Sequence, residues 1–174
     1  MADSTTVLFD EHAIQERIAG LAAEISERIP GDFMILGLLK GSFVFIADLA
    51  RALHRHDRHP EIEFIRLSSY GLEKTSAGEV HLLGDCPTDL AGRKVLLIDD
   101  IADTGRSLAY ARALLEQRDV AQLWSCVLLD KPSRREVEVP VDFVGFTIED
   151  LFVAGYGIDY AEKYRELPHI VVVD

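Results

Sequence analysis

Two short, nearly continuous apolar runs, residues 33–39 and 95–98, constrain the fold of this chain more than any other feature. Runs of this length are typical of strands that are covered on both faces of a sheet. Apolar spacing predicts helices over residues 14–29, 43–53 and 108–115, and further strands over 62–67, 80–83, 123–129, 143–146 and 170–173. Because strands and helices alternate, the sequence predicts an α/β fold with a mostly parallel sheet of about five strands flanked by helices.

The 174 residues contain no internal repeat and no linker, so we expect residues 1–174 to form a single domain. The formal net charge is −12, which argues against nonspecific nucleic-acid binding, because such proteins present a basic face to the phosphates. The two cysteines, Cys86 and Cys126, are too few for a disulfide framework and indicate a reducing compartment. No signal peptide is visible and no apolar run approaches the roughly 20 residues of a membrane helix, so we expect a cytoplasmic protein without a membrane partner.

The segment Val95–Leu108 carries the strongest functional signal: a buried strand, two adjacent acids, a short polar loop and then a helix. In open α/β sheets, ligands bind beyond the carboxyl ends of the strands. Gly105 permits close approach of the backbone, and Thr104 and Ser107 offer hydroxyl groups. Because the first amides of a helix lack partners within it, they are available to an anion. The segment therefore predicts a site for a monophosphate group.

Asp99 and Asp100 follow the buried strand and are suited to accept hydrogen bonds from vicinal ribose hydroxyls, either directly or through Mg²⁺. The alternative is a strand that ends in a capped turn at residues 103–105, with Asp103 serving only as the helix cap. The complete order of strand, acids, loop and helix favours the ligand site over this alternative.

The same segment resembles the phosphoribosyl-pyrophosphate signature of the type I phosphoribosyltransferases. Further matches narrow the resemblance to the hypoxanthine-guanine branch and lie at Leu38–Ser42, Ser68–Gly71, Asp142–Phe146, Phe152–Tyr160 and Tyr164–Arg165. The resemblance implies a small hood built from the terminal segments. It also implies purine salvage, in which the 5-phosphoribosyl group passes from phosphoribosyl pyrophosphate to hypoxanthine or guanine and gives IMP or GMP and pyrophosphate. The family further implies Mg²⁺ as cofactor, small-molecule substrates as partners, and a homo-oligomer of two or four copies.

The resemblance assigns a role to each matched residue. Asp103 is the catalytic base that faces N7 of the purine. The phosphoribosyl group is bound by Asp99, Asp100, Ala102, Asp103, Thr104, Gly105, Arg106 and Ser107. Pyrophosphate is bound by Lys40, Gly41, Ser69, Tyr70 and Arg165, the purine by Lys131, Phe152, Val153 and Asp159, and Mg²⁺ by Asp99, Asp100 and Asp159.

Three of these motifs have simpler alternatives. The branch carries a non-proline cis peptide bond in the turn at Lys40 and Gly41, although an ordinary turn capped by Ser42 fits the same residues. Lys131 resembles the lysine that donates to the purine O6, whereas most loop lysines are solvated. Residues 68–79 are predicted to form a polar loop, and the resemblance identifies it as a lid that excludes water during the reaction.

Two residues depart from the pattern of the branch. Asp99 stands where Glu is more common, and a paired Asp-Asp also occurs in xanthine-guanine enzymes, so xanthine transfer is an alternative activity. Ala102 replaces a larger aliphatic residue beside Asp103. A regulatory relative of the fold that binds RNA is a second alternative, and the acidic charge together with Lys40, Asp103 and Lys131 argues against it.

Overall fold

The computed structural model describes residues 5–70 and 79–173, and at Ser69 and Tyr70 it describes the backbone alone. The helices are α1 (Glu11–Arg28), α2 (Phe43–His54), α3 (Arg106–Glu116) and a short 3-10 helix, η1 (Pro132–Arg134). The strands are β1 (Thr5–Phe9), β2 (Met34–Leu39), β3 (Glu61–Tyr70), β4 (Glu79–Leu83), β5 (Lys94–Ala102), β6 (Gln122–Asp130), β7 (Phe143–Thr147), β8 (Val153–Ala154) and β9 (Ile170–Val173). Each predicted helix and strand is present.

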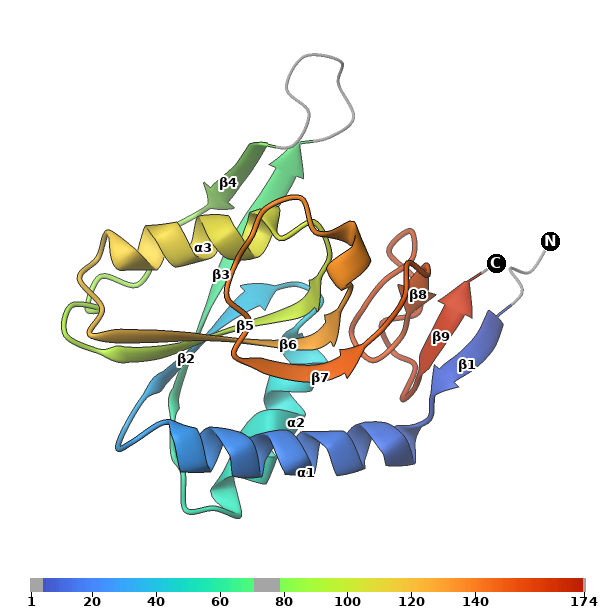
Figure 1. Cartoon of the computed structure of the whole chain (residues 1–174), viewed down its shortest axis with the longest axis horizontal. Coiled ribbons are helices and arrows are strands. Elements are labelled where there is room, and N and C mark those ends of the chain that lie inside the picture. Colours follow the sequence, from blue (N-terminus) through green and yellow to red (C-terminus); the bar gives the residue numbers. More distant parts are fainter. Residues whose placement is uncertain (1–4, 71–78, 174) are drawn as a thin grey trace.

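Within these ranges the main sheet has six strands in the order β4-β3-β2-β5-β6-β7. The five neighbouring strands β3, β2, β5, β6 and β7 are parallel to one another. The edge strand β4 pairs with β3 in the antiparallel direction. A second, three-stranded antiparallel sheet in the order β1-β9-β8 joins the two ends of the chain beside the main sheet (Figure 1). The prediction of a mostly parallel sheet with a small hood is therefore confirmed, and we call this second sheet the hood.

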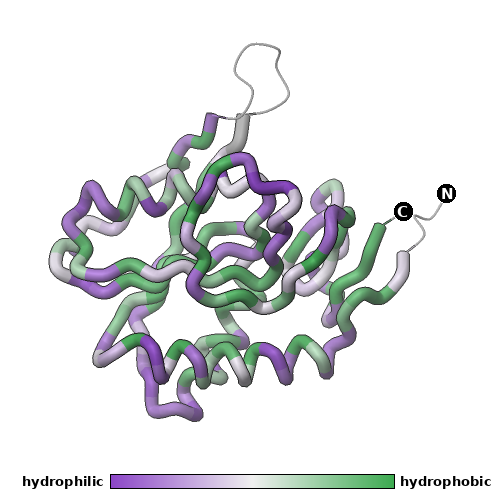
Figure 2. Tube along the Cα trace, in the orientation of Figure 1, coloured by the Kyte–Doolittle hydropathy of each residue, from purple (hydrophilic) through white to green (hydrophobic). Residues whose placement is uncertain are grey.

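Helix α1 begins at a well-defined cap and has one buried face. The carboxylate of Asp10 accepts a hydrogen bond from the amide of Ala13 at 2.8 Å, which satisfies one of the unpaired donors of the first turn. Figure 2 shows polar and apolar residues alternating along the helix, as expected where one stripe faces a core. Its buried side chains are Ile14, Ile18, Leu21, Ala22 and Ile25. Each fully buried Ile or Leu contributes roughly 1.5–3 kcal/mol.

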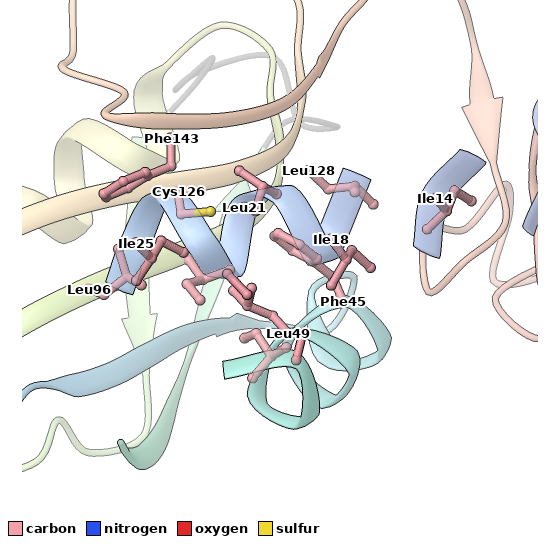
Figure 3. Close-up of a cluster of buried hydrophobic side chains, with 14 of the residues drawn as sticks. Ile14, Ile18, Leu21, Ile25, Phe45, Leu49, Leu96, Cys126, Leu128 and Phe143 are labelled. Atoms are coloured by element: carbon pink, nitrogen blue, oxygen red, sulfur yellow. The ribbon is translucent and has the colours of Figure 1, made fainter. Parts of the chain in front are cut away.

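The helices cover both faces of the main sheet, with α1 and α2 on one side and α3 on the other (Figure 1). Successive residues of the central strands point to opposite faces. Ile35 and Leu96 therefore join the core under α1 and α2, whereas Leu36 and Leu97 join the core under α3. Figure 3 shows the first core, with Ile18, Leu21 and Ile25 of α1 against Phe45, Leu49, Leu96, Cys126, Leu128 and Phe143. None of the described helices combines the length and the apolar character that a membrane crossing requires.

Two strand boundaries differ from the prediction. Strand β5 continues through Asp99 and Asp100 to Ala102, because its backbone stays paired with β6 as far as Asp130. The acids therefore lie inside the strand and not after it. Strand β3 extends to Tyr70, into the polar stretch predicted as a loop, because β4 pairs with it as far as the Tyr70–Glu79 pair. The remainder of the predicted lid, residues 71–78, lies outside the described residues.

Candidate functional site

A pocket of about 440 Å³ opens at the carboxyl ends of β2 and β5, where ligands bind in open α/β sheets. The predicted site residues that line it are Lys40, Gly41, Asp99, Asp100, Ala102, Asp103, Thr104, Gly105, Ser107, Asp159 and Arg165. Those that do not line it are Arg106, Lys131, Phe152 and Val153. The side chains of Ser69 and Tyr70 lie outside the described part of the chain. One cavity thus brings together residues from the first half of the chain, from β5 and from the C-terminal segment.

The loop between β5 and α3 presents the start of a helix to this pocket. Helix α3 begins at Arg106 with Gly105 as its N-cap residue, so the reading of Asp103 as the helix cap is wrong. Gly105 has φ +86°, and a Cβ at this position would lie 2.5 Å from the carbonyl oxygen of Val137. Only glycine fits both constraints. The backbone amides and the positive end of the helix dipole make this loop suitable for an anion.

Two adjacent carboxylates form the floor of the pocket. The Asp99 side chain is buried, and its Oδ1 accepts a hydrogen bond from the Asp100 amide at 2.9 Å. Burial, together with the neighbouring Asp100 carboxylate, raises the pKa of Asp99 well above its ordinary value. Asp100 Oδ2 lies where a Cβ on Gly41 would be, at only 1.7 Å. The glycine therefore lets the turn after β2 approach the acids of β5.

Asp103, the predicted catalytic base, is partly exposed at the pocket. Its Oδ1 lies 3.2 Å from Nε of Arg134, and that Nε lies 3.6 Å from Asp150 Oδ1. The backbone carbonyl of Asp103 accepts a hydrogen bond from Arg135 at 3.1 Å. Sequence reasoning missed both arginines, although the run of cations that follows β6, starting at Lys131, was a signal next to an acidic loop.

The turn after β2 carries Lys40 and contains a non-proline cis peptide bond, but this bond lies between Leu39 and Lys40, one position before the expected Lys40–Gly41 bond. Ser42 donates its hydroxyl to the Leu38 carbonyl at 2.5 Å and makes no side-chain cap bond to α2. The alternative of an ordinary turn capped by the Ser42 side chain is therefore wrong. Lys40 Nζ lies 2.9 Å from Glu162 Oε2 across the pocket.

The C-terminal segment supplies the opposite wall of the pocket. Arg165 lies 2.8 Å from Asp159 Oδ1 and 3.7 Å from Glu162 Oε2, and it also donates to the Gly157 carbonyl at 2.8 Å. Asp159 Oδ2 accepts the Glu162 amide at 2.8 Å, so both of its oxygens already have partners. Glu162 is a pocket residue that sequence reasoning missed, because a lone exposed glutamate carries no motif.

Three of the four predicted purine-binding residues, Lys131, Phe152 and Val153, lie outside the lining of this pocket, whereas the fourth, Asp159, lines it. Lys131 is buried, with 6% of its surface exposed, and donates to the Leu151 carbonyl at 2.6 Å, so the reading as a solvated loop lysine is wrong. Phe152 is 77% exposed, which leaves its ring free to stack against a planar ligand. Val153 is buried in β8, where its backbone pairs with Val172 of β9. The roles of these three residues stay predictions.

The cation chemistry of the site rests on oxygen donors. In the ranges that the structure describes, no group of three or more His, Cys, Asp or Glu side chains is arranged to hold a metal ion. Asp99 and Asp100 nevertheless form a closely spaced pair of like charges, and a divalent cation would relieve their repulsion. Hard oxygen donors of this kind suit Mg²⁺, which is commonly bound by one or two carboxylates together with substrate phosphates.

Comparison with known proteins gives matches over nearly the whole chain. The family model described as "Phosphoribosyl transferase domain" matches residues 4–161. Hypoxanthine phosphoribosyltransferase of Escherichia coli K12 is 45% identical over 173 residues, covering 98% of this chain and 96% of the relative. Hypoxanthine-guanine phosphoribosyltransferase of Bacillus subtilis is 41% identical, covering 98% of this chain and 94% of the relative. The crystal structure of a hypoxanthine phosphoribosyltransferase from Staphylococcus aureus superposes with a TM-score of 0.89 at 38% identity and covers 97% of this chain and 91% of its own.

Proposed function

The chain belongs to the phosphoribosyl transferase domain family, and from that premise we propose that it transfers the 5-phosphoribosyl group of phosphoribosyl pyrophosphate to hypoxanthine or guanine. The products are IMP or GMP and pyrophosphate. One observation carries the proposal: Asp103, Thr104, Gly105 and Ser107, which we call the anion loop, line the same pocket as Lys40 and Arg165. A phosphate site and two separate cations within one cavity suit a substrate that bears a phosphate at one end and a pyrophosphate at the other.

In the proposed reaction, N9 of the base forms a bond to the anomeric carbon while the bond from that carbon to pyrophosphate breaks, with inversion. Asp103 accepts or holds the proton at N7 as positive charge builds on the purine. The 5′-phosphate binds at the start of α3, and the ribose hydroxyls bind at Asp99 and Asp100. These groups supply mostly positioning and electrostatic stabilisation, because the leaving group and the base bring the reactive atoms themselves.

Mg²⁺ fits the proposed site at Asp99 and Asp100, because their carboxylates offer two hard donors whose mutual repulsion it would relieve. When bound, the ion neutralises and spreads the charge of the pyrophosphate group. Each carboxylate oxygen of Asp159 already has one partner, Arg165 or the Glu162 amide, so a metal ion at Asp159 would have to share the carboxylate with them. The proposal therefore gives Asp99 and Asp100 the larger share of metal binding.

Selection of a 6-oxopurine is assigned to Lys131. Its ammonium group is buried and already donates to the Leu151 carbonyl, so its position is fixed before a base arrives. An ammonium group has three donor hydrogens and no acceptor. It can therefore donate to the O6 of hypoxanthine or guanine, whereas the 6-amino group of adenine offers it no acceptor at that position.

The test is an assay of pyrophosphate release from phosphoribosyl pyrophosphate and Mg²⁺ with hypoxanthine, guanine, xanthine and adenine in separate reactions. We expect kcat/KM to be highest for hypoxanthine or guanine and lowest for adenine. Equal or higher kcat/KM with xanthine would identify the xanthine-guanine activity instead. Absence of release with all four bases would refute the proposal.

A further inference from the structure

A single carboxylate joins the two cations that the proposed function assigns to pyrophosphate. Glu162 Oε2 lies 2.9 Å from Lys40 Nζ and 3.7 Å from the Nη2 atom of Arg165. Lys40 comes from the turn after β2 and Arg165 from the C-terminal segment, so Glu162 bridges the two walls of the pocket. The Glu162 carboxylate oxygen therefore lies between Lys40 and Arg165, the two cations that would bind a pyrophosphate oxygen.

The backbone around Glu162 directs its side chain into this position. Ala161 and Glu162 have φ values of +51° and +63°, in a tight turn closed by reciprocal bonds between the backbones of Tyr160 and Lys163, both at 3.0 Å. The Glu162 amide donates to Asp159 at 2.8 Å, which fixes the turn to the same acid that orients Arg165. The bond from Lys40, reinforced by the charges of Lys40 and Arg165, lowers the pKa of Glu162, so the carboxylate is ionised at neutral pH.

We propose that Glu162 sets the affinity of the site for pyrophosphate by acting as a built-in anion that occupies Lys40 and Arg165 until the substrate displaces it. The inference rests on the proposed function, which supplies the ligand. Binding of a pyrophosphate group exchanges one anion for another at the same two cations, so part of the attraction is offset by the contact that is lost. The cost is small, because the Glu162 side chain is 69% exposed and solvent screens its ion pairs.

The arrangement favours release of the product pyrophosphate, at the cost of some affinity for the substrate. After transfer, pyrophosphate is held by the same cations, and a tethered carboxylate beside them competes for both. Arg165 keeps its 2.8 Å contact with Asp159 and its bond to Gly157 when Glu162 moves away, so the arginine stays oriented. Among the residues that the structure describes, Lys40 forms its ion pair with Glu162 alone, so Glu162 affects Lys40 more strongly than Arg165.

The inference is tested with Glu162→Gln, which keeps the size of the side chain and removes its charge. The matched control is Glu166→Gln, which makes the same charge change four residues away at an exposed position outside this pocket. Calorimetric titration with magnesium pyrophosphate should give binding about two- to five-fold tighter for Glu162→Gln, the range that an exposed ion pair supports. The KM for phosphoribosyl pyrophosphate should fall in the same proportion, and Glu166→Gln should match the wild type in both measurements.

A Lys40→Met background supplies the second arm of the test. If Glu162 acts through Lys40, most of the gain from Glu162→Gln disappears when Lys40 is absent, because the two changes are coupled. If the wild-type protein is active but Glu162→Gln binds pyrophosphate no more tightly than the wild type, this inference alone is overturned. If Glu162→Gln binds pyrophosphate more tightly but the wild-type protein transfers no phosphoribosyl group to any purine, the proposed function is overturned and the role of Glu162 stands.

Discussion

The Nε atom of Arg134 lies 3.2 Å from the Oδ1 atom of Asp103. Both side chains are partly exposed, so solvent screens the pair and it contributes little to the free energy of unfolding. Its effect is on position, because the same guanidinium also contacts Asp150 and therefore ties the acid of the loop to the segment after β7. The carboxylate of Asp103 is thus oriented at the pocket by its contact with Arg134.

Asp103→Asn should reduce turnover far more than it reduces affinity for phosphoribosyl pyrophosphate. The amide keeps the shape of the side chain but accepts no proton, and loss of a general base typically costs about 10²- to 10⁴-fold in rate. Steady-state kinetics give kcat and KM, and calorimetry gives the affinity. A variant with wild-type kcat would remove Asp103 from the mechanism.

Arg134→Gln should lower kcat by up to about five-fold and leave the KM for phosphoribosyl pyrophosphate unchanged. This is the largest factor that the loss of an exposed ion pair is expected to produce. The control is Arg51→Gln, which breaks a comparable exposed pair with Asp48 on α2, outside the pocket. Equal kinetics in the two variants would show that the contact between Arg134 and Asp103 does not position the base.

Lys131→Met should abolish the preference for 6-oxopurines. Methionine fills the same buried space but donates nothing to O6 or to the Leu151 carbonyl, and a carbonyl left without a partner costs about 1–3 kcal/mol. We expect kcat/KM for hypoxanthine to fall by at least about 100-fold, and adenine to gain relative to it. Thermal unfolding measures the structural part of the loss separately. Retained selectivity for hypoxanthine would contradict the assignment.

Gly41→Ala should weaken binding of phosphoribosyl pyrophosphate. The new Cβ would lie 1.7 Å from Asp100 Oδ2, so the carboxylate or the turn must move. Displacing either disturbs two parts of the proposed site, and we expect KM to rise about ten-fold, equivalent to about 1.4 kcal/mol. The control is Gly20→Ala in α1, where the added carbon meets only the flexible end of Arg17 at 3.0 Å. A normal KM in Gly41→Ala would show that the turn tolerates the shift.

The Cys126 thiol should resist chemical labelling in the folded protein. It is fully buried, and burial raises its pKa well above that of an ordinary thiol, so the reactive thiolate is scarce. Because the pKa of Cys126 is higher in the folded than in the unfolded protein, the stabilisation from its neutral thiol is complete below the ordinary thiol pKa and is lost as the pH rises toward the raised pKa. In a Cys86→Ser background, Ellman's reagent at pH 8 should react at least about 100-fold faster in urea than in buffer. Comparable rates would contradict the burial.

The central strands could be predicted because each is covered on both faces and therefore appears as an unbroken apolar run. Strands β1 and β8 could not be predicted. Strand β1 is largely exposed and lacks such a run, and β8 has only two residues, Val153 and Ala154. Their pairing depends on β9, which is distant from both in the sequence.

The anion loop could be predicted because its residues lie within one short segment, which contains the whole signal. The contacts between segments could not. Arg134 meets Asp103 across 31 positions, and Glu162 meets Lys40 across 122 positions. Neither pair has a spacing rule, since only the packing of the sheet and the C-terminal segment decides which side chains meet. The continuation of β5 through Asp99 was missed because acids usually end a buried strand, whereas here the backbone pairing with β6 persists.

The hood connects β1 to Val153, a residue of the proposed purine site, through a single strand. Strand β9 lies between β1 and β8, and the backbone of Val153 in β8 pairs with Val172 of β9. Strand β1 is therefore connected to β8 only through β9. Deleting residues 170–173 would therefore remove the centre of this sheet and leave both neighbours with unpaired backbone groups. Among the described strands β1 is an outer strand of this sheet, so an affinity tag should be tolerated better before β1 than after the central strand β9.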